Sequence, residues 1–106
     1  MCEPVEYGLA SFYGIDDGFA GKKTANGEIY EIDKLTAAHM SLPIGSIVRV
    51  IHGSQNVFVR INDRGPARWT GNSIDLTPRA FEKLAPLARG VVPVTIELCN
   101  KLKERT

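Results

Sequence analysis

Four residues in this chain carry the side chains that general acid–base catalysis uses: Glu28, His39, Asp63 and Asp75. Each of them follows or interrupts a segment of apolar or small residues, so we expect each side chain to be partly buried. Taken singly, such residues more often make structural hydrogen bonds than catalyse a reaction. Together they are sufficient to build an acid–base site if the fold brings them close to one another.

Asp63 lies where the character of the sequence changes most abruptly. Residues 57–61 alternate as a strand does, and Asn62, Asp63 and Arg64 follow before Gly65-Pro66 ends the strand. Two interpretations are consistent with this spacing. Asp63 either caps the turn and pairs locally with Arg64, or it acts as an acid or base that the end of a rigid strand holds in place.

The length and composition indicate one globular domain. We expect a single domain over residues 1–106, with its core at about 7–98, and 43% hydrophobic residues argue against disorder. A net charge of +1 with both signs interspersed predicts no nucleic-acid partner and is easier to reconcile with a polysaccharide. No metal-ligand spacing and no phosphate-binding glycine loop occurs, so we expect neither a metal nor a cofactor.

The two cysteines, Cys2 and Cys99, lie near opposite ends of the chain. If the first and last strands are neighbours, a disulfide between them would close almost the whole chain and contribute at most ~4–5 kcal/mol. The alternatives are two unpaired thiols, or a Cys2 that is kept for lipid attachment.

The order of elements predicts a mainly β protein. Strands are expected at residues 6–14, 28–32, 46–51, 57–61, 73–76 and 91–99. Residues 33–39 are expected to form a short helical turn capped by Asp33, and residues 77–85 a helix that Thr77 caps. The charged tail 100–106 is expected to fray. Short strands with frequent turns indicate a small barrel or sandwich.

Six short blocks occur in a fixed order along the chain: Gly8–Gly14, Thr24–Glu28, Leu35–His39, Leu42-Pro43, Val59–Pro66 and Ile74–Thr77. Together they resemble the rare lipoprotein A family over about residues 7–98, nearly the whole chain. The resemblance implies a six-stranded double-psi β-barrel with one or two short helices. It also implies a lytic transglycosylase that cleaves peptidoglycan between N-acetylmuramic acid and N-acetylglucosamine. The expected product carries a 1,6-anhydro end, because the bond breaks without water.

The resemblance also assigns roles to individual residues. Asp63 matches the family's catalytic acid/base, while His39 and Glu28 match other polar residues associated with activity. Asp75 matches a carboxylate that the related expansin barrels need. These four residues are therefore the expected catalytic set.

Five further residues are expected to contact the substrate: Ser11, Tyr13, Asn62, Arg64 and Trp69. Ser11 and Tyr13 match first-strand positions that line the groove in relatives, although Tyr13 is also consistent with a half-buried core residue. Trp69 either stacks on a sugar ring or covers an end of the barrel.

One carboxyl group can first donate a proton to the glycosidic oxygen and then accept one from the sugar's own 6-hydroxyl. For this, Asp63 must be protonated part of the time, which burial or a nearby Asp75 would favour. A guanidinium paired with Asp63 would oppose it. We therefore expect Arg64 to point away, toward a backbone carbonyl or another acid.

The implied partners are peptidoglycan glycan strands, including strands stripped of their stem peptides, and we expect a monomer. The family implies export to the bacterial periplasm or cell envelope, outer-membrane lipoproteins included. Residues 1–4 lack the pattern of a secretory leader, so an exported protein would correspond to the processed part, with any lipid anchor outside this chain. The alternative function is a non-catalytic, expansin-like module that binds or loosens cell-wall glycan.

Overall fold

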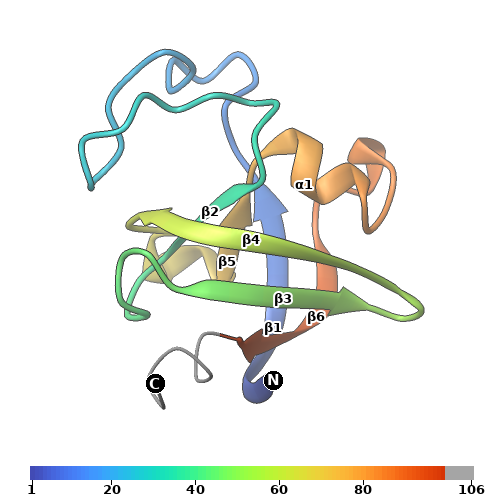
Figure 1. Ribbon diagram of the computed structural model, residues 1–106. Helices are drawn as coiled ribbons and strands as arrows, with labels where there is room; N and C mark the ends of the chain where they lie inside the picture. The colour runs from blue at the N-terminus through green and yellow to red at the C-terminus, as the bar shows by residue number, and fades with distance from the viewer. Residues whose placement is uncertain (100–106) are drawn as a thin grey trace.

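The computed structural model describes residues 1–99, which form a closed barrel of six strands (Figure 1). The strands are β1 (Glu3–Phe12), β2 (Thr36–His39), β3 (Ile47–His52), β4 (Gln55–Asp63), β5 (Ile74–Leu76) and β6 (Val92–Leu98). One α-helix, α1 (Pro78–Glu82), and two 3-10 turns, η1 (Arg68–Thr70) and η2 (Leu87–Arg89), complete the secondary structure. Among residues 1–99, none of the helices is long and apolar enough to cross a membrane. The predicted fraying of residues 100–106 lies outside the described part of the chain.

The strands close in the order β1-β5-β2-β4-β3-β6. Two of the six pairings are parallel, β1 with β5 and β2 with β4, and the other four are antiparallel. Parallel neighbours need long connections, so strands distant in sequence come to lie side by side. The expected mainly β barrel of six strands with short helices is confirmed.

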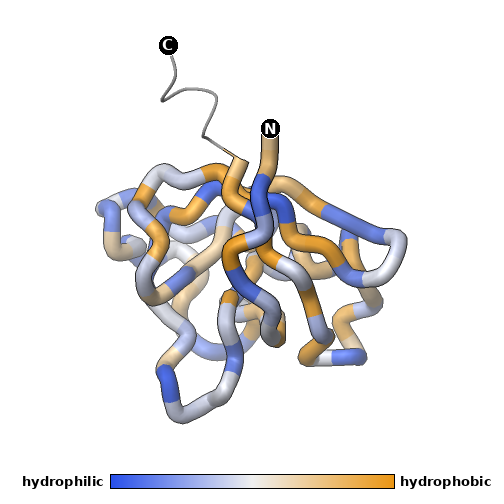
Figure 2. Tube along the Cα trace, turned by 90° about the horizontal axis from the view of Figure 1, so that it is seen from below, coloured by the Kyte–Doolittle hydropathy of each residue, from blue (hydrophilic) through white to orange (hydrophobic). Residues whose placement is uncertain are grey.

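Alternating apolar residues of every strand fill the barrel. On β4 the side chains of Val57, Val59 and Ile61 are buried, as their spacing predicts, and on β6 Val92 and Ile96 are fully buried. Figure 2 shows apolar and polar residues interspersed along the chain. The alternation follows from the pleat of a strand, which sends successive side chains to opposite faces.

Helix α1 closes one end of the barrel. The Thr77 hydroxyl accepts a hydrogen bond from the backbone N–H of Ala80 at 3.2 Å, and Pro78 occupies the first helical position. The fully buried Phe81 packs edge-on against Phe12, with ring centroids 5.0 Å apart. The predicted helix is confirmed at its start but is shorter than residues 77–85, because the chain turns after residue 82.

Two predicted elements are wrong. Residues 28–32 form a single bridge between Lys23 and Ile29 rather than a strand, because their backbone groups bond the loop before them instead of the barrel. Residues 36–39 form strand β2 and not a helical turn. Hydrogen bonding to β4 on one side and β5 on the other outweighs the helical preference of Ala37 and Ala38.

The long connection from Tyr13 to Leu35 holds no named strand or helix and arches over one end of the barrel (Figure 1). Its turn at Thr24–Glu28 bonds to the end of β4, where the Asn26 backbone N–H donates to the Asn62 carbonyl at 3.3 Å. This segment therefore lies against the strand end that carries Asp63.

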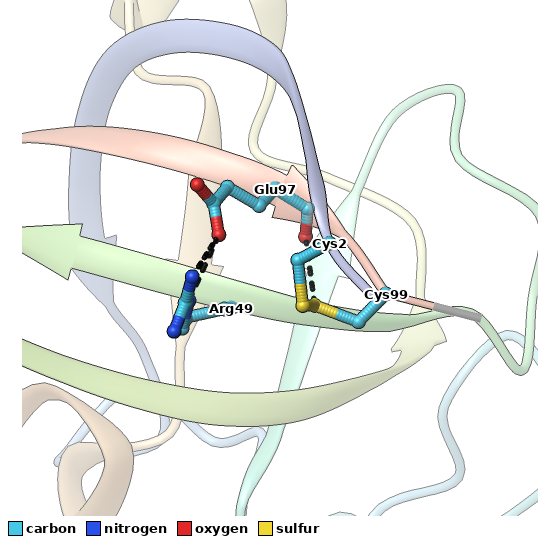
Figure 3. Close-up of a disulfide and its surroundings, with 4 residues drawn as sticks. All are labelled: Cys2, Arg49, Glu97 and Cys99. Atoms are coloured by element: carbon cyan, nitrogen blue, oxygen red, sulfur yellow. Dashed lines mark hydrogen bonds and ion pairs between the residues drawn. A yellow bond between two sulfur atoms is a disulfide. The ribbon is translucent and has the colours of Figure 1, made fainter. Parts of the chain in front are cut away.

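Cys2 and Cys99 form a disulfide that joins the first strand to the end of the last one (Figure 3). The alternative of two free thiols is excluded in residues 1–99, and a disulfide-bonded Cys2 has no sulfur left for a lipid. Beside the bond, the Arg49 guanidinium donates to Glu97 at 2.8 Å and ties β3 to β6.

Removing the disulfide should destabilise the barrel. The bond links residues 97 positions apart, and on the loop-entropy argument its loss in Cys2→Ser/Cys99→Ser should lower the free energy of unfolding by ~2–5 kcal/mol. Urea unfolding with and without a reductant would measure this. The reductant should lower the free energy of unfolding of the wild type to that of the double variant, whose own value should not change. A wild-type free energy of unfolding that is the same with and without the reductant would contradict the prediction.

Candidate functional site

The barrel register lines up two carboxylates across four strands. Ala38 of β2 pairs with Asp63 of β4 on one side and with Asp75 of β5 on the other, and Asp75 pairs with Ser11 of β1. Residues directly opposite one another share a face of a sheet. The neighbouring Ala37 pairs with the core residues Ile61 and Leu76 and faces the interior. Successive side chains alternate between faces, so the row through Ala38 lies on the outer face of the barrel.

A one-residue irregularity in the β2–β4 ladder creates this row. Ala37 pairs with Ile61 and Ala38 pairs with Asp63, so Asn62 is an extra residue on β4. Such bulges re-aim side chains at the ends of strands. Without the bulge, Ala38 would pair with Asn62, and Asp63 would not share the outer face with Asp75. The two aspartate Cα atoms are separated by two strand spacings, roughly 10 Å.

Three donors hold the Asp63 carboxyl group. Its Oδ1 accepts from the backbone N–H groups of Ala25 and Arg64, both at 2.9 Å. Its Oδ2 accepts from the Tyr13 hydroxyl at 2.9 Å. The turn interpretation is thus partly correct, since Asp63 bonds the next backbone N–H. The other two donors come from distant segments and fix the orientation of the carboxyl group.

The Arg64 side chain points away from Asp63, as predicted. Its Nη1 donates to the backbone carbonyls of His39 at 3.0 Å and Leu42 at 2.6 Å. The guanidinium therefore links β4 to the segment that follows β2. The Arg64 guanidinium therefore does not pair with the Asp63 carboxyl group.

Tyr13 is clamped between aromatic rings. It stacks on Tyr30 with centroids 4.3 Å apart, and Phe19 contacts it edge-on at 5.6 Å. Gly14, at a φ of +108°, leaves the space that the Tyr30 ring occupies, since a Cβ there would collide with it. Burial, and then the bond to Asp63, raises the pKa of the Tyr13 phenol well above its usual range. Tyr13 is therefore half core, one of the two predicted possibilities, and stays protonated.

Asp75 lies in a partly buried setting on β5 and accepts a hydrogen bond from the Ser11 hydroxyl. Burial raises the pKa of Asp75, and the nearby negative charges of Asp17 and Asp63 act in the same direction, against the Ser11 bond. Like charges disfavour simultaneous ionisation. Asp75 therefore holds a proton more readily than an isolated aspartate does.

Glu28 is a fixed anion. Arg60 donates to both of its oxygens, at 2.8 and 3.0 Å, and Asn62 Nδ2 donates to Oε1 at 3.0 Å. The bonds from Arg60, followed by that from Asn62, lower the pKa of Glu28 to about 2. A carboxylate that stays ionised at neutral pH is unsuited to donate a proton. Its contacts hold the Thr24–Glu28 turn against the end of β4.

The His39 ring lies on the other face of β2 from Asp63, because it directly follows Ala38 in the strand. The ring is 4% exposed, and its Nδ1 accepts from the backbone N–H groups of Ser41 and Leu42 at 3.1 Å. Nε2 then carries the proton and donates to Glu6 at 2.7 Å. Both ring nitrogens have partners away from Asp63, while the His39 carbonyl accepts from Arg64.

Trp69 lies in η1, on the connection between β4 and β5, and is 88% exposed. That exposure excludes the alternative in which it covers an end of the barrel. The fold thus brings together Asp63, Asp75, Ser11 and Tyr13, with Asn62 and Glu28 beside them. It does not bring the His39 ring to Asp63.

Sequence reasoning missed three residues that hold the site: Glu6, which bonds His39; Tyr30, which stacks on Tyr13; and Arg60, which clamps Glu28. Their partners are 33, 17 and 32 positions away. No local spacing reports such contacts. The one signal in the sequence was the opposite charge of Arg60 and Glu28, which is compatible with an ion pair.

A closed six-stranded barrel with two parallel strand pairs is the architecture of the double-psi β-barrel class. Solved structures of similar fold include the Streptomyces papain inhibitor, with a TM-score of 0.71 and 26% identity over 88% of this chain and 92% of that chain. A mutant expansin of Clavibacter michiganensis in complex with cellohexaose has a TM-score of 0.68 and 18% identity, over 93% of this chain and 50% of that one. Residues 5–96 match the family described as lytic transglycolase, and the chain belongs to that family.

A curated relative is the probable endolytic peptidoglycan transglycosylase RlpA of a Nostoc species. It is 49% identical over 96 residues, which cover 89% of this chain and 26% of the relative. The chain spans less than half of the length of the curated relatives that it matches.

The Glu28–Arg60 pair should make stability depend on pH at the acid end. The folded pKa of Glu28, about 2, lies below its ordinary value of 4.5, so the pair's contribution is present above pH 4.5 and lost as the pH falls toward 2. Both side chains are 39% exposed, so solvent screening limits the contribution to ~1 kcal/mol or less. Urea unfolding at pH 6 and pH 3 should show a smaller drop for Glu28→Gln than for the wild type.

The control is Arg60→Gln, whose pH dependence should lie between those of the wild type and Glu28→Gln, because Asn62 still bonds Glu28. The double variant should behave like Glu28→Gln. A wild-type drop retained in Glu28→Gln would contradict the role of the pair.

Proposed function

We propose that this chain is the catalytic barrel of an endolytic peptidoglycan lytic transglycosylase that uses Asp63 as general acid and base. The observation that carries the proposal is the setting of Asp63: a strand-end carboxyl group fixed by three donors, with the Arg64 guanidinium turned away. Family membership and the names of the curated relatives support the reaction type and a glycan substrate. The bond to be cleaved joins N-acetylmuramic acid to N-acetylglucosamine.

In the first step, Asp63 donates its proton to the glycosidic oxygen as the bond to the muramic acid C1 breaks. In the second, the Asp63 carboxylate accepts the proton of the 6-hydroxyl while that oxygen bonds C1. Asp63 gives up one proton and takes one back. The 6-hydroxyl is the nucleophile, so no water is consumed. The product is a 1,6-anhydro end.

The partners of Asp63 indicate which oxygen carries the proton. Oδ1 accepts from two backbone N–H groups, which cannot act as acceptors. Oδ2 meets the Tyr13 hydroxyl, which can donate or accept. Tyr13 can keep donating to one lone pair of Oδ2 while the other lone pair takes up and releases the proton that is exchanged with the substrate. Tyr13 thus acts as a positioning residue in this mechanism.

The other expected residues take supporting roles in the proposal. Asp75, whose pKa is raised by burial, holds a proton on the same outer face as Asp63. Glu28 positions the Thr24–Glu28 turn that donates to Asp63, and His39 positions Arg64 through its carbonyl. Ser11 and Asn62 hold Asp75 and Glu28, and the exposed Trp69 is proposed as a stacking platform for a sugar ring.

The proposal includes a site of action outside the cytoplasm, in the bacterial periplasm or cell envelope, as a monomer. The Cys2–Cys99 disulfide supports it, because such bonds persist mainly in oxidising compartments. A lipid anchor would need a sulfur other than that of Cys2. Recovery of the protein from the cytosolic fraction with both thiols reduced would contradict this site of action.

Asp63→Asn should abolish glycan cleavage. Incubation of peptide-free glycan strands with the wild type, followed by mass spectrometry, should reveal anhydro-muramic ends. The variant should form them roughly 100-fold more slowly or not at all. Asp33→Asn, an exposed aspartate of the long connection, is the matched control and should keep full activity. Intact strands that only co-sediment with the wild type would indicate the non-catalytic, expansin-like alternative instead.

Tyr13→Phe should lower kcat about tenfold or more and leave KM nearly unchanged, because only the hydroxyl on Oδ2 is lost while the ring stack stays. The measurement is the rate of anhydro-end formation against strand concentration. Tyr7→Phe, on the strand that leads into Tyr13 and 76% exposed, should behave like the wild type. Equal kcat values for the two variants would argue against a positioning role for Tyr13.

A further inference from the structure

A carboxylate points into the barrel from strand β1. Glu6 pairs with Ile96 of β6, which is fully buried, and residues directly opposite one another share a face of a sheet. Alternate residues of β1 lie on this inner face, which includes the fully buried Ala10. A charged group on an inner face costs free energy unless a partner compensates it. Glu6 has such a partner in the buried His39 ring.

The His39 ring joins Glu6 to the turn that follows β2. Its Nε2 donates to the Glu6 carboxylate at 2.7 Å, while its Nδ1 accepts from the backbone N–H groups of Ser41 and Leu42, both at 3.1 Å. A carboxylate bonded to one ring nitrogen fixes the orientation of an imidazole and keeps the other nitrogen as an acceptor. Glu6 therefore holds the ring in the position that closes the turn.

The same turn holds the Arg64 side chain. Its Nη1 donates to the carbonyls of His39 at 3.0 Å and Leu42 at 2.6 Å, the first and last residues of the turn. Both carbonyls face one nitrogen only while the turn keeps its shape. Arg64 directly follows Asp63, so a guanidinium released from the turn would be free to pair with that carboxyl group. Such a pair favours the charged form of a carboxyl group.

We infer that Glu6 is a positioning residue for the proposed reaction and acts on Asp63 through His39 and Arg64. Its carboxylate holds the His39 ring, and the ring holds the turn at residues 39–42. The two carbonyls of that turn keep the Arg64 guanidinium away from Asp63, which must carry a proton in the first step. The inference rests on the proposed function, since it assigns a further residue to the same site.

A second ion pair of the barrel provides a comparison. Glu97 of β6 lies 2.7 Å from Arg49 of β3, and this pair lies beside the disulfide rather than on the route to Asp63 (Figure 3). Its side chains are 14% and 36% exposed, and those of Glu6 and His39 are 35% and 5% exposed. A role in stability alone would make the two glutamates equivalent, whereas a positioning role makes only Glu6 matter for kcat.

The test is a double-variant cycle on kcat for anhydro-end formation from peptide-free glycan strands. Glu6→Met, which keeps the length of the side chain and removes the acceptor, should lower kcat about tenfold and leave KM nearly unchanged. In an Arg64→Met background, which has no guanidinium to release, the same change should alter kcat less than about twofold. Glu6→Gln should keep kcat within about threefold of the wild type, because its amide oxygen still accepts from His39 Nε2.

Glu97→Met is the matched control and should keep the kcat of the wild type, although it removes an ion pair between strands. Urea unfolding of each variant would establish that it is folded in the assay. An equal fold loss from Glu6→Met in the wild-type and Arg64→Met backgrounds would overturn the inference. Equal kcat values for Glu6→Met and Glu97→Met, or for Glu6→Met and Glu6→Gln, would overturn it as well.

Hydrogen exchange of single backbone amides tests the same route without a substrate. In Glu6→Met, the amide hydrogens of Ser41 and Leu42 should exchange about tenfold faster than in the wild type, and in Glu97→Met they should not change. Faster exchange in Glu6→Met, with no anhydro ends formed by the wild type, would support the route through the turn and contradict the lytic activity. Anhydro-end formation that Glu6→Met leaves unchanged would support the lytic activity and contradict the inference.

Discussion

The site depends on the pairing of β2 between β4 and β5. This strand has four residues, all buried, and Ala38 at its centre sets Asp63 on one side and Asp75 on the other. The bulge at Asn62 is what turns Asp63 to the same face. A slip of one residue in this ladder would send Asp63 to the opposite face and separate the two carboxylates. The geometry of the candidate site therefore depends on a backbone register more than on any one side-chain bond.

The charged groups around this register have different tasks because their surroundings differ. Glu28 faces a guanidinium and an amide, and its low pKa makes it a permanent anion that ties down a loop. Asp75 is partly buried among other acids, which raises its pKa and suits it to hold a proton. Asp63 is oriented by two rigid N–H groups and one reversible hydroxyl. Side chains of the same chemical type thus differ in role: Glu28 holds a loop, while Asp63 and Asp75 are the groups proposed for proton transfer.

Strand β1 connects the stability of the barrel to the site. Its beginning follows Cys2, whose disulfide joins it to the end of β6, and its end carries Ser11 and leads into Tyr13. The same fold occurs in a papain inhibitor and in expansin, so the fold alone does not set the activity. The match to the family over residues 5–96 is therefore the finding that bears on activity.

The sequence by itself determined the local features. The alternation along β4 and β6, the Thr77 cap of α1 and the ordered blocks that identify the family all follow from short-range spacing. The two wrong elements, at 28–32 and 36–39, are short segments whose state depends on which partners their backbone meets. Only the tertiary structure decided that Ala38 lies between two aspartates, that Arg60 clamps Glu28 and that Tyr13 reaches Asp63. The side-chain contacts join residues 32 and 50 positions apart, and the two aspartates lie on either side of a third strand. At such separations the closure of the barrel and the strand register select the neighbours, and local preference does not.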